Sequence, residues 1–144
     1  MSIIYRIDKE QGITFALWHG LVTADEFLAH ARKLLSDADW PPHKALHLSD
    51  IQTASIDASI DEATLETVAN LYGQHPKIAK LTAAVVAGES FEKAVVFQNF
   101  IMRYRPSVIV FNTLNTACLW LGIYVDETER TLQSMRAEFR GKTD

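Results

Sequence analysis

The chain has 144 residues, of which 48% are hydrophobic and 22% charged, which is typical of one globular domain and excludes a long disordered arm. Its formal net charge of -4 argues against nucleic acid as a partner, because phosphate-binding surfaces need clustered Lys and Arg. The single cysteine, Cys118, excludes an intramolecular disulfide, and no run approaches the roughly 18 apolar residues of a transmembrane segment. We therefore expect one cytoplasmic domain over residues 1–144, ordered except for Gly141 to Asp144.

Alternating apolar residues predict a β-hairpin at the start of the chain. The alternation runs over residues 3–7 and again over 13–17, and turn-forming residues 9–12 separate the two strands. A capping box that begins at Thr23 then starts a helix. We expect this helix to end near Asp37, because two prolines follow and cannot continue it.

The middle of the chain predicts two more strands with a helix between them. A short strand over 45–48 is followed by Ser59 and Glu62, which have the spacing of a second capping box, so we expect Ser59 to be the N-cap of the next helix. The run 81–87 is apolar on both of its alternating faces, as a strand is when helices cover both sides of its sheet. This run is the best candidate for a central parallel strand.

The remaining elements complete an alternating pattern. A helix ends before Pro106, a strand covers 108–111, and Thr113 caps a helix that Gly122 ends. An extra C-terminal helix is expected over 126–140. The order ββαβαβαβα plus this helix predicts an α/β domain with a single mixed sheet of about five strands, mainly parallel after the first and flanked by helices.

Two segments resemble the SpoIIAA-like branch of the STAS superfamily. Segment 46–60 is similar to the STAS stretch in which a strand leads to an aspartate near a helix start. Segment 108–122 is similar to the last strand of that family, which ends in an aromatic residue, and to the following helix with an alanine and a Trp-Leu pair. The resemblance covers about residues 3–123. It implies a SpoIIAA-like fold and a regulatory module that acts through protein contact as a homodimer.

One position departs from the phosphorylatable members of that family. In those proteins a serine directly follows the aspartate, whereas Ala58 follows Asp57 here, which argues against a phosphorylation switch. Ser59 keeps a hydroxyl nearby, where a phosphate would meet the free amides of a helix start. Its ordinary role as a helix cap is the preferred interpretation.

Candidate binding residues follow from the topology. Ligands of open α/β sheets lie beyond the carboxyl ends of the strands, where loops meet helix N-termini. We expect polar side chains in such positions to be candidates for binding a small polar or anionic ligand. They are Ser49, Asp50, Asp57, Ser59, Ser90 and Asn112. Structural roles are the preferred interpretation of these residues, with Ser90 as a helix cap and Asp50 as an acceptor for nearby backbone amides.

The histidines and the cysteine do not predict a metal site or a catalytic centre, and no cofactor motif is present. His43 and His47 would share one face of a strand, but four residues place them about 13 Å apart, too far for one ion. Cys118 lies among apolar helix residues and is expected to be a small buried hydrophobic side chain. The other histidines are expected to be surface or capping residues: His19, His30 and His75.

Three functions stay open, of which a non-enzymatic binding or regulatory module is preferred. Apolar side chains outside the expected core would serve its protein contacts: Phe100, Met102, Trp120 and Tyr124. The alternative is a carrier of a small molecule or lipid, with a pocket walled by Phe97, Phe100 and Trp120. A hydrolase or transferase that uses Asp50, Ser59 or Cys118 has least support, because no motif joins a nucleophile to a base.

Overall fold

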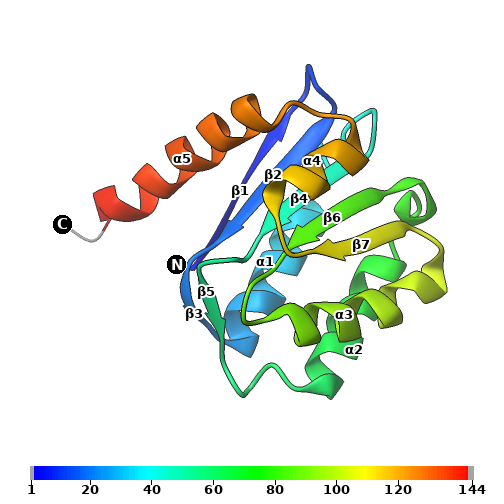
Figure 1. Cartoon of the computed structure of the whole chain (residues 1–144). Coiled ribbons are helices and arrows are strands. Elements are labelled where there is room, and N and C mark those ends of the chain that lie inside the picture. Colours follow the sequence, from blue (N-terminus) through cyan, green and yellow to red (C-terminus); the bar gives the residue numbers. More distant parts are fainter. Residues whose placement is uncertain (1, 143–144) are drawn as a thin grey trace.

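A five-stranded mixed sheet forms the centre of the protein, whose computed structural model describes residues 2–142 (Figure 1). The strand order across the sheet is β1-β2-β4-β6-β7. These strands have the bounds β1 Ile3–Asp8, β2 Ile13–Trp18, β4 Leu46–Asp50, β6 Thr82–Val86 and β7 Ser107–Phe111. β1 is antiparallel to β2, and the later neighbours are parallel. The predicted fold class and element order are confirmed.

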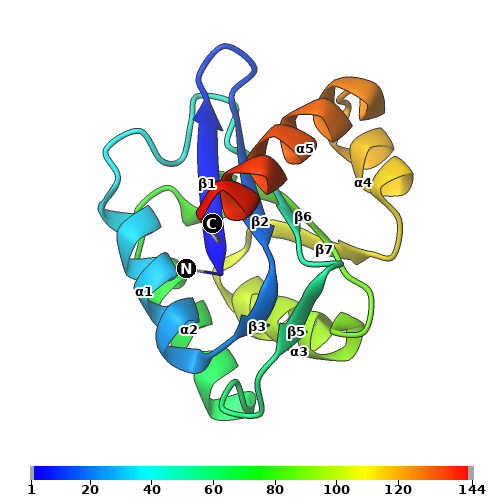
Figure 2. The same ribbon diagram turned by 90° about the vertical axis from the view of Figure 1, so that its left-hand side faces the viewer.

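In the described part of the chain, five α-helices cover the two faces of this sheet (Figures 1 and 2). Their bounds are α1 Ala24–Ser36, α2 Glu62–Gly73, α3 Phe91–Ile101, α4 Leu114–Leu121 and α5 Val125–Lys142. Short 3-10 helices precede β6 and follow α3, at Ile78–Lys80 and Met102–Tyr104. Helices α1, α2 and α3 lie on one face, and α4 and α5 lie on the other. The domain therefore has three layers, with the sheet in the middle.

Strand β6 is covered on both sides, as its apolar sequence predicts. It has β4 and β7 as parallel neighbours. Ala83 and Val85 point toward α1, α2 and α3, whereas Ala84 and Val86 join the core beneath α4 and α5. Alternate side chains of β6 thus pack against different helical layers, one on each face of the sheet.

The first helix begins and ends as predicted, but the second does not begin at the predicted cap. Thr23 and Glu26 form both halves of the capping box of α1. The N-cap of α2 is Asp61, whose side chain accepts a hydrogen bond from the Thr64 amide at 2.9 Å. The prediction that Ser59 caps α2 was therefore wrong.

A turn closed by Asp57 explains the shift of this cap. The Asp57 side chain accepts a hydrogen bond from the Ser59 amide at 3.0 Å, and its carbonyl accepts one from the Ile60 amide at 3.0 Å. This turn places Ile60 in the core with 1% of its surface exposed, so the N-cap of the helix lies two residues after Ser59. The Ser59 hydroxyl instead accepts a hydrogen bond from the Ala24 amide, at the start of α1.

Two short strands form a second, parallel sheet that the sequence did not predict. β3, Gly20–Val22, pairs with β5, Ala54–Ile56 (Figure 2). Each strand has only three residues, which is too short for a detectable alternation. This pair lies beyond the ends of β2 and β4 and extends the sheet toward the N-termini of α1 and α2.

The C-terminal helix is longer than predicted. α5 begins one residue earlier, at Val125, and continues through Gly141 to Lys142, two residues beyond the predicted end. Residues 143–144 lie outside the described part. None of the helices in residues 2–142 combines the length and apolar character that crossing a membrane requires.

Candidate ligand-binding cavity

An apolar cavity of about 110 Å³ lies between the sheet and the layer formed by α1, α2 and α3. Large aromatic side chains from the strand ends, loops and helices form much of its wall: Trp18, Phe27, Trp40, Tyr72 and Phe97. The sheet contributes shorter side chains, Ser49 on β4 and Ala83 and Val85 on β6. The short side chains of the sheet and the rigid aromatic rings opposite them do not fill the space between the two layers. The cavity is the space that remains.

The rings hold one another at steep angles. The Trp18 and Phe27 rings are 5.0 Å apart at 62°, and the Phe27 and Phe97 rings are 5.9 Å apart at 60°. Tyr72 continues the series, with its ring 6.3 Å from Phe97 at 85°. Edge-to-face contacts of this kind are favourable, so the rings support one another around the space rather than collapsing into it.

A chain of hydrogen bonds crosses the sheet side of the cavity. The Trp40 indole N–H donates to His47 Nδ1 at 3.4 Å, and His47 Nε2 lies 3.0 Å from Ser49 Oγ. Because the indole can only donate, Nδ1 must accept, which assigns the neutral tautomer with the proton on Nε2. Burial, with a smaller contribution from the charge of His30, lowers the pKa of His47 to about 3.

His30 lies in the same wall, on α1. It is buried against the Trp18 and Tyr5 rings, with ring centroids 6.5 and 5.8 Å away. Burial lowers its pKa to about 4, and the nearby charge of Lys33 lowers it further. Both histidines are therefore neutral near pH 7, and neither adds charge to the cavity.

Two buried donors at the cavity wall have no hydrogen-bond partner among the described residues. They are the indole N–H of Trp18, at the end of β2, and the hydroxyl of Ser90, at the N-cap of α3. The two residues are only 9% and 7% exposed. Lys93 also lines the cavity, and its ammonium donates to the carbonyls of Ile60 at 2.7 Å and Asp57 at 3.4 Å. Donor capacity thus remains among the residues around this mainly apolar cavity.

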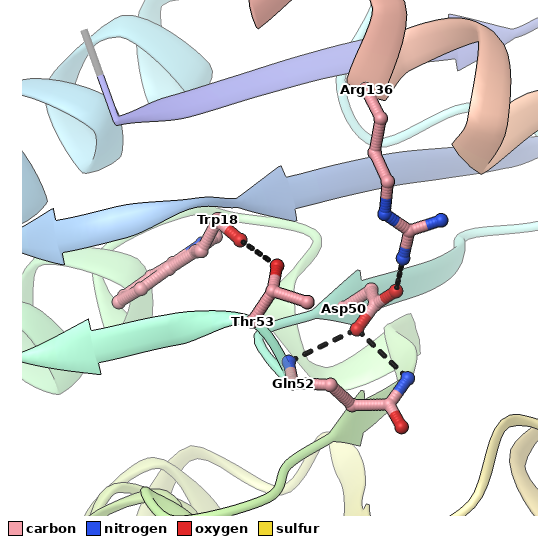
Figure 3. Close-up of polar contacts among 5 residues, drawn as sticks. All are labelled: Trp18, Asp50, Gln52, Thr53 and Arg136. Atoms are coloured by element: carbon pink, nitrogen blue, oxygen red, sulfur yellow. Dashed lines mark hydrogen bonds and ion pairs between the residues drawn. The ribbon is translucent and has the colours of Figure 1, made fainter.

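The predicted binding residues do not form one site. Ser49 and Ser90 line the cavity, but Asp50 points to the opposite face of the sheet. There its carboxylate is 1% exposed and lies 2.7 Å from the guanidinium of Arg136 on α5. The Gln52 amide donates to the other carboxylate oxygen at 3.1 Å (Figure 3). Figure 3 also shows the Trp18 indole lying away from this ion pair, and Trp18 is one of the residues that line the cavity.

The other three predicted residues, Asp57, Ser59 and Asn112, lie outside the cavity. Asp57 accepts hydrogen bonds in the turn before α2, chiefly from Ser59, and these bonds lower its pKa. Asn112 is exposed between β7 and α4. None of these three lines the cavity. The strand-end rule therefore found only two of the residues that the fold brings together, because it does not distinguish the two faces of the sheet.

Comparison with known proteins identifies the fold. No known protein family and no curated protein matches the chain. Among solved structures, an uncharacterized protein of the DUF3478 family from Shewanella loihica PV-4, described as having a SpoIIAA-like fold, is similar with a TM-score of 0.54. The match covers 83% of this chain and 94% of that chain, at 14% sequence identity. The chain has a SpoIIAA-like fold. At this identity the likeness concerns the fold alone.

Within this SpoIIAA-like fold, two predictions about the histidines were wrong. His30 was expected at the surface but is buried. His43 was expected on the same strand face as His47, but β4 begins only at Leu46, so His43 lies in an exposed loop. Among residues 2–142, no cluster of three or more His, Cys, Asp or Glu side chains could hold a metal ion.

Cys118 is buried in α4, as predicted, and burial raises the pKa of its thiol. A raised pKa disfavours the thiolate that a nucleophile requires. The three side chains considered for catalysis are each engaged elsewhere: Asp50 with Arg136, Ser59 with the Ala24 amide, and Cys118 in the core of α4.

Sequence reasoning missed Trp18, His30 and Lys93 as parts of a site. A signal existed for His30, which lies three residues after Phe27 and therefore on the apolar stripe of the helix. Trp18 is the last residue of β2, whose other face was assigned to the core, so its orientation toward a different layer was not evident. Phe97 lines the cavity as expected for a carrier, whereas Phe100 and Trp120 do not.

Proposed function

We propose that the protein binds a compact, largely apolar molecule in this cavity, as a carrier or sensor of that molecule. The observation that supports the proposal is a space of about 110 Å³ whose wall is almost entirely apolar. An engineered apolar cavity of about 150 Å³ in another protein stays dry and binds benzene, so the volume suits a ligand of roughly one small ring.

Energetics favour occupation of such a space. Side chains around a void lose dispersion contacts on one side, and the cost of a cavity grows with its volume. An apolar ligand restores those contacts and leaves water, whereas a water molecule would find few partners against the apolar part of the wall. The fold keeps the space open through mutually supporting rings, which spares the ligand the cost of forming it.

Toluene is the probe that tests the proposal. We expect saturable binding to the wild-type protein by calorimetry, with one site and a raised melting temperature. Ala83→Leu should abolish the binding, because its larger side chain projects into the cavity. Ala63→Leu makes the same change on the exposed start of α2 and should leave binding intact. No saturable binding of toluene to the wild type, or equal binding to both variants, would contradict the proposal.

Protein contact remains a second candidate because of an exposed apolar surface on and after α4. Leu119 and Tyr124 are 82% and 78% exposed, and Trp120 is 36% exposed. Met102 is also exposed, but Phe100 packs against the core and does not contribute. Light scattering at high protein concentration tests self-association through this surface, and a strict monomer would weigh against it.

A further inference from the structure

The polar groups at the cavity wall indicate which kind of ligand it accepts, provided that the proposed binding function holds. The residues that line it include no aspartate or glutamate. They include two buried donors without a partner among the described residues, on Trp18 and Ser90, and one ammonium, on Lys93. A wall with donors and positive charge but no acidic side chain is suited to a ligand that accepts hydrogen bonds.

Ser90 and Lys93 lie one turn apart at the start of α3, so both side chains are on the same side of this 11-residue helix. Ser90 occupies the N-cap position, but its side chain makes no capping hydrogen bond. Its hydroxyl is buried without a partner among the described residues, and Ser90 is one of the residues around the cavity. The positive end of the helix dipole is therefore present beside a free hydroxyl, in the arrangement that binds carboxylates and phosphates elsewhere.

Lys93 adds a full positive charge to this end of the cavity. Its two hydrogen bonds are to backbone carbonyls, and it forms no ion pair within 4 Å with the described residues. Asp57 and Asp61 lie close enough for its charge to lower their pKa values. Both carboxylates accept hydrogen bonds from backbone amides outside the cavity, so neither occupies the position of a ligand within it.

We infer that the ligand is a small monocarboxylic acid, with its apolar body against the Phe27 and Phe97 rings and its carboxylate toward Ser90, Lys93 and the Trp18 indole. A carboxylate can accept from all three donors, whereas an amine would place a second positive charge beside Lys93. The cavity volume of about 110 Å³ limits the part of the ligand that it holds to a single ring or a short branched chain.

Four ring compounds of nearly equal size test this inference: benzoate, benzyl alcohol, toluene and benzylamine. Calorimetry at pH 7 should give the tightest binding for benzoate and no binding for benzylamine. Three variants remove one donor each while keeping most of the apolar side chain: Trp18→Phe, Ser90→Ala and Lys93→Met. Each should weaken benzoate about tenfold or more and toluene less than about twofold, because hydrogen bonds to charged groups contribute most to affinity.

Matched controls are available outside the cavity. Ser107→Ala and Lys77→Met remove an exposed hydroxyl and an exposed ammonium, and should leave benzoate binding unchanged. Toluene binding without a preference for benzoate over benzyl alcohol would overturn the carboxylate inference and leave the cavity function standing. Failure of toluene to bind would remove both. Benzoate that binds the three donor variants as tightly as the wild type would also overturn the inference, whatever its affinity.

Discussion

The two faces of the sheet differ in how completely their cores are filled. Beneath α4 and α5, Phe15 on β2, Leu48 on β4 and Met135 on α5 are at most 2% exposed and form one continuous cluster. Beneath α1, α2 and α3, aromatic rings surround a cavity, and the buried His30 and His47 take part in its wall. The face beneath α4 and α5 is therefore closely packed, whereas the face beneath α1, α2 and α3 contains a cavity and buried polar groups.

This difference separates stability from binding within a small domain. The filled face also contains the buried carboxylate of Asp50 with its partner Arg136, which ties the extra C-terminal helix to the sheet. Changes on that face should therefore alter the free energy of unfolding and little else. Changes on the cavity face should alter ligand binding and the response to pH, with smaller effects on stability.

Neighbouring alanines on β6 give the most direct test of this comparison. Ala84→Leu forces a larger side chain into the filled core, where the alanine is 0% exposed, and should lower the free energy of unfolding by about 3 kcal/mol. Ala83→Leu projects into the cavity and should change it by less than about 1 kcal/mol in either direction. Urea unfolding measures both values. Equal costs would show that the two faces are packed alike.

The second test uses pH. Burial holds the pKa of His30 at about 4 in the folded protein, whereas the unfolded chain binds a proton below about pH 6.5. Its neutral form therefore supports full stability above about pH 6.5, and the stability falls as the pH drops toward 4. His30→Phe should remove this loss and make the decrease in unfolding free energy between pH 7.5 and 4.5 smaller by on the order of 2 kcal/mol.

Other groups act in distinguishable ways in that pH experiment. His47 has a lowered pKa for the same reason, so the variant should keep part of the decrease. The lowered pKa values of Glu26 and Asp37 concern carboxylates, whose contributions are lost mainly below about pH 4.5. If the wild type and His30→Phe lose stability in parallel from pH 7.5 to 4.5, the histidine does not titrate as its burial predicts.

The fold was predictable from the sequence because its signals are local and repeated. Alternation defined the hairpin, the two-sided apolar run 81–87 defined β6, and Thr23 marked the start of α1. The three-residue strands β3 and β5 were not predicted, since a strand of that length contains too little alternation to detect. Their pairing depends on contacts between segments that are far apart in the chain.

The cavity could not be predicted in the same way. It is the space left between side chains of several helices, strands and loops, and its existence depends on how all of them pack together. Trp18, Trp40 and Phe97 come from different parts of the sequence, and no spacing relates them. The rule that ligands lie at strand ends pointed to Ser49 and Ser90, but it grouped them with Asp50, which belongs to the other face. Side-chain direction at a strand end is decided by register, and register is set by the whole sheet.

The smallest predicted effect concerns the start of α2, where the sequence suggested the wrong cap. Asp61→Ala removes the acceptor for the Thr64 amide and should destabilise the protein by about 1 kcal/mol, as the loss of an N-cap does. Ser59→Ala removes an exposed hydrogen bond from the Ala24 amide and should cost about half as much. Urea unfolding of both variants decides the order. A larger loss for Ser59→Ala would return the capping role to Ser59, and the turn before α2 would then need a different explanation.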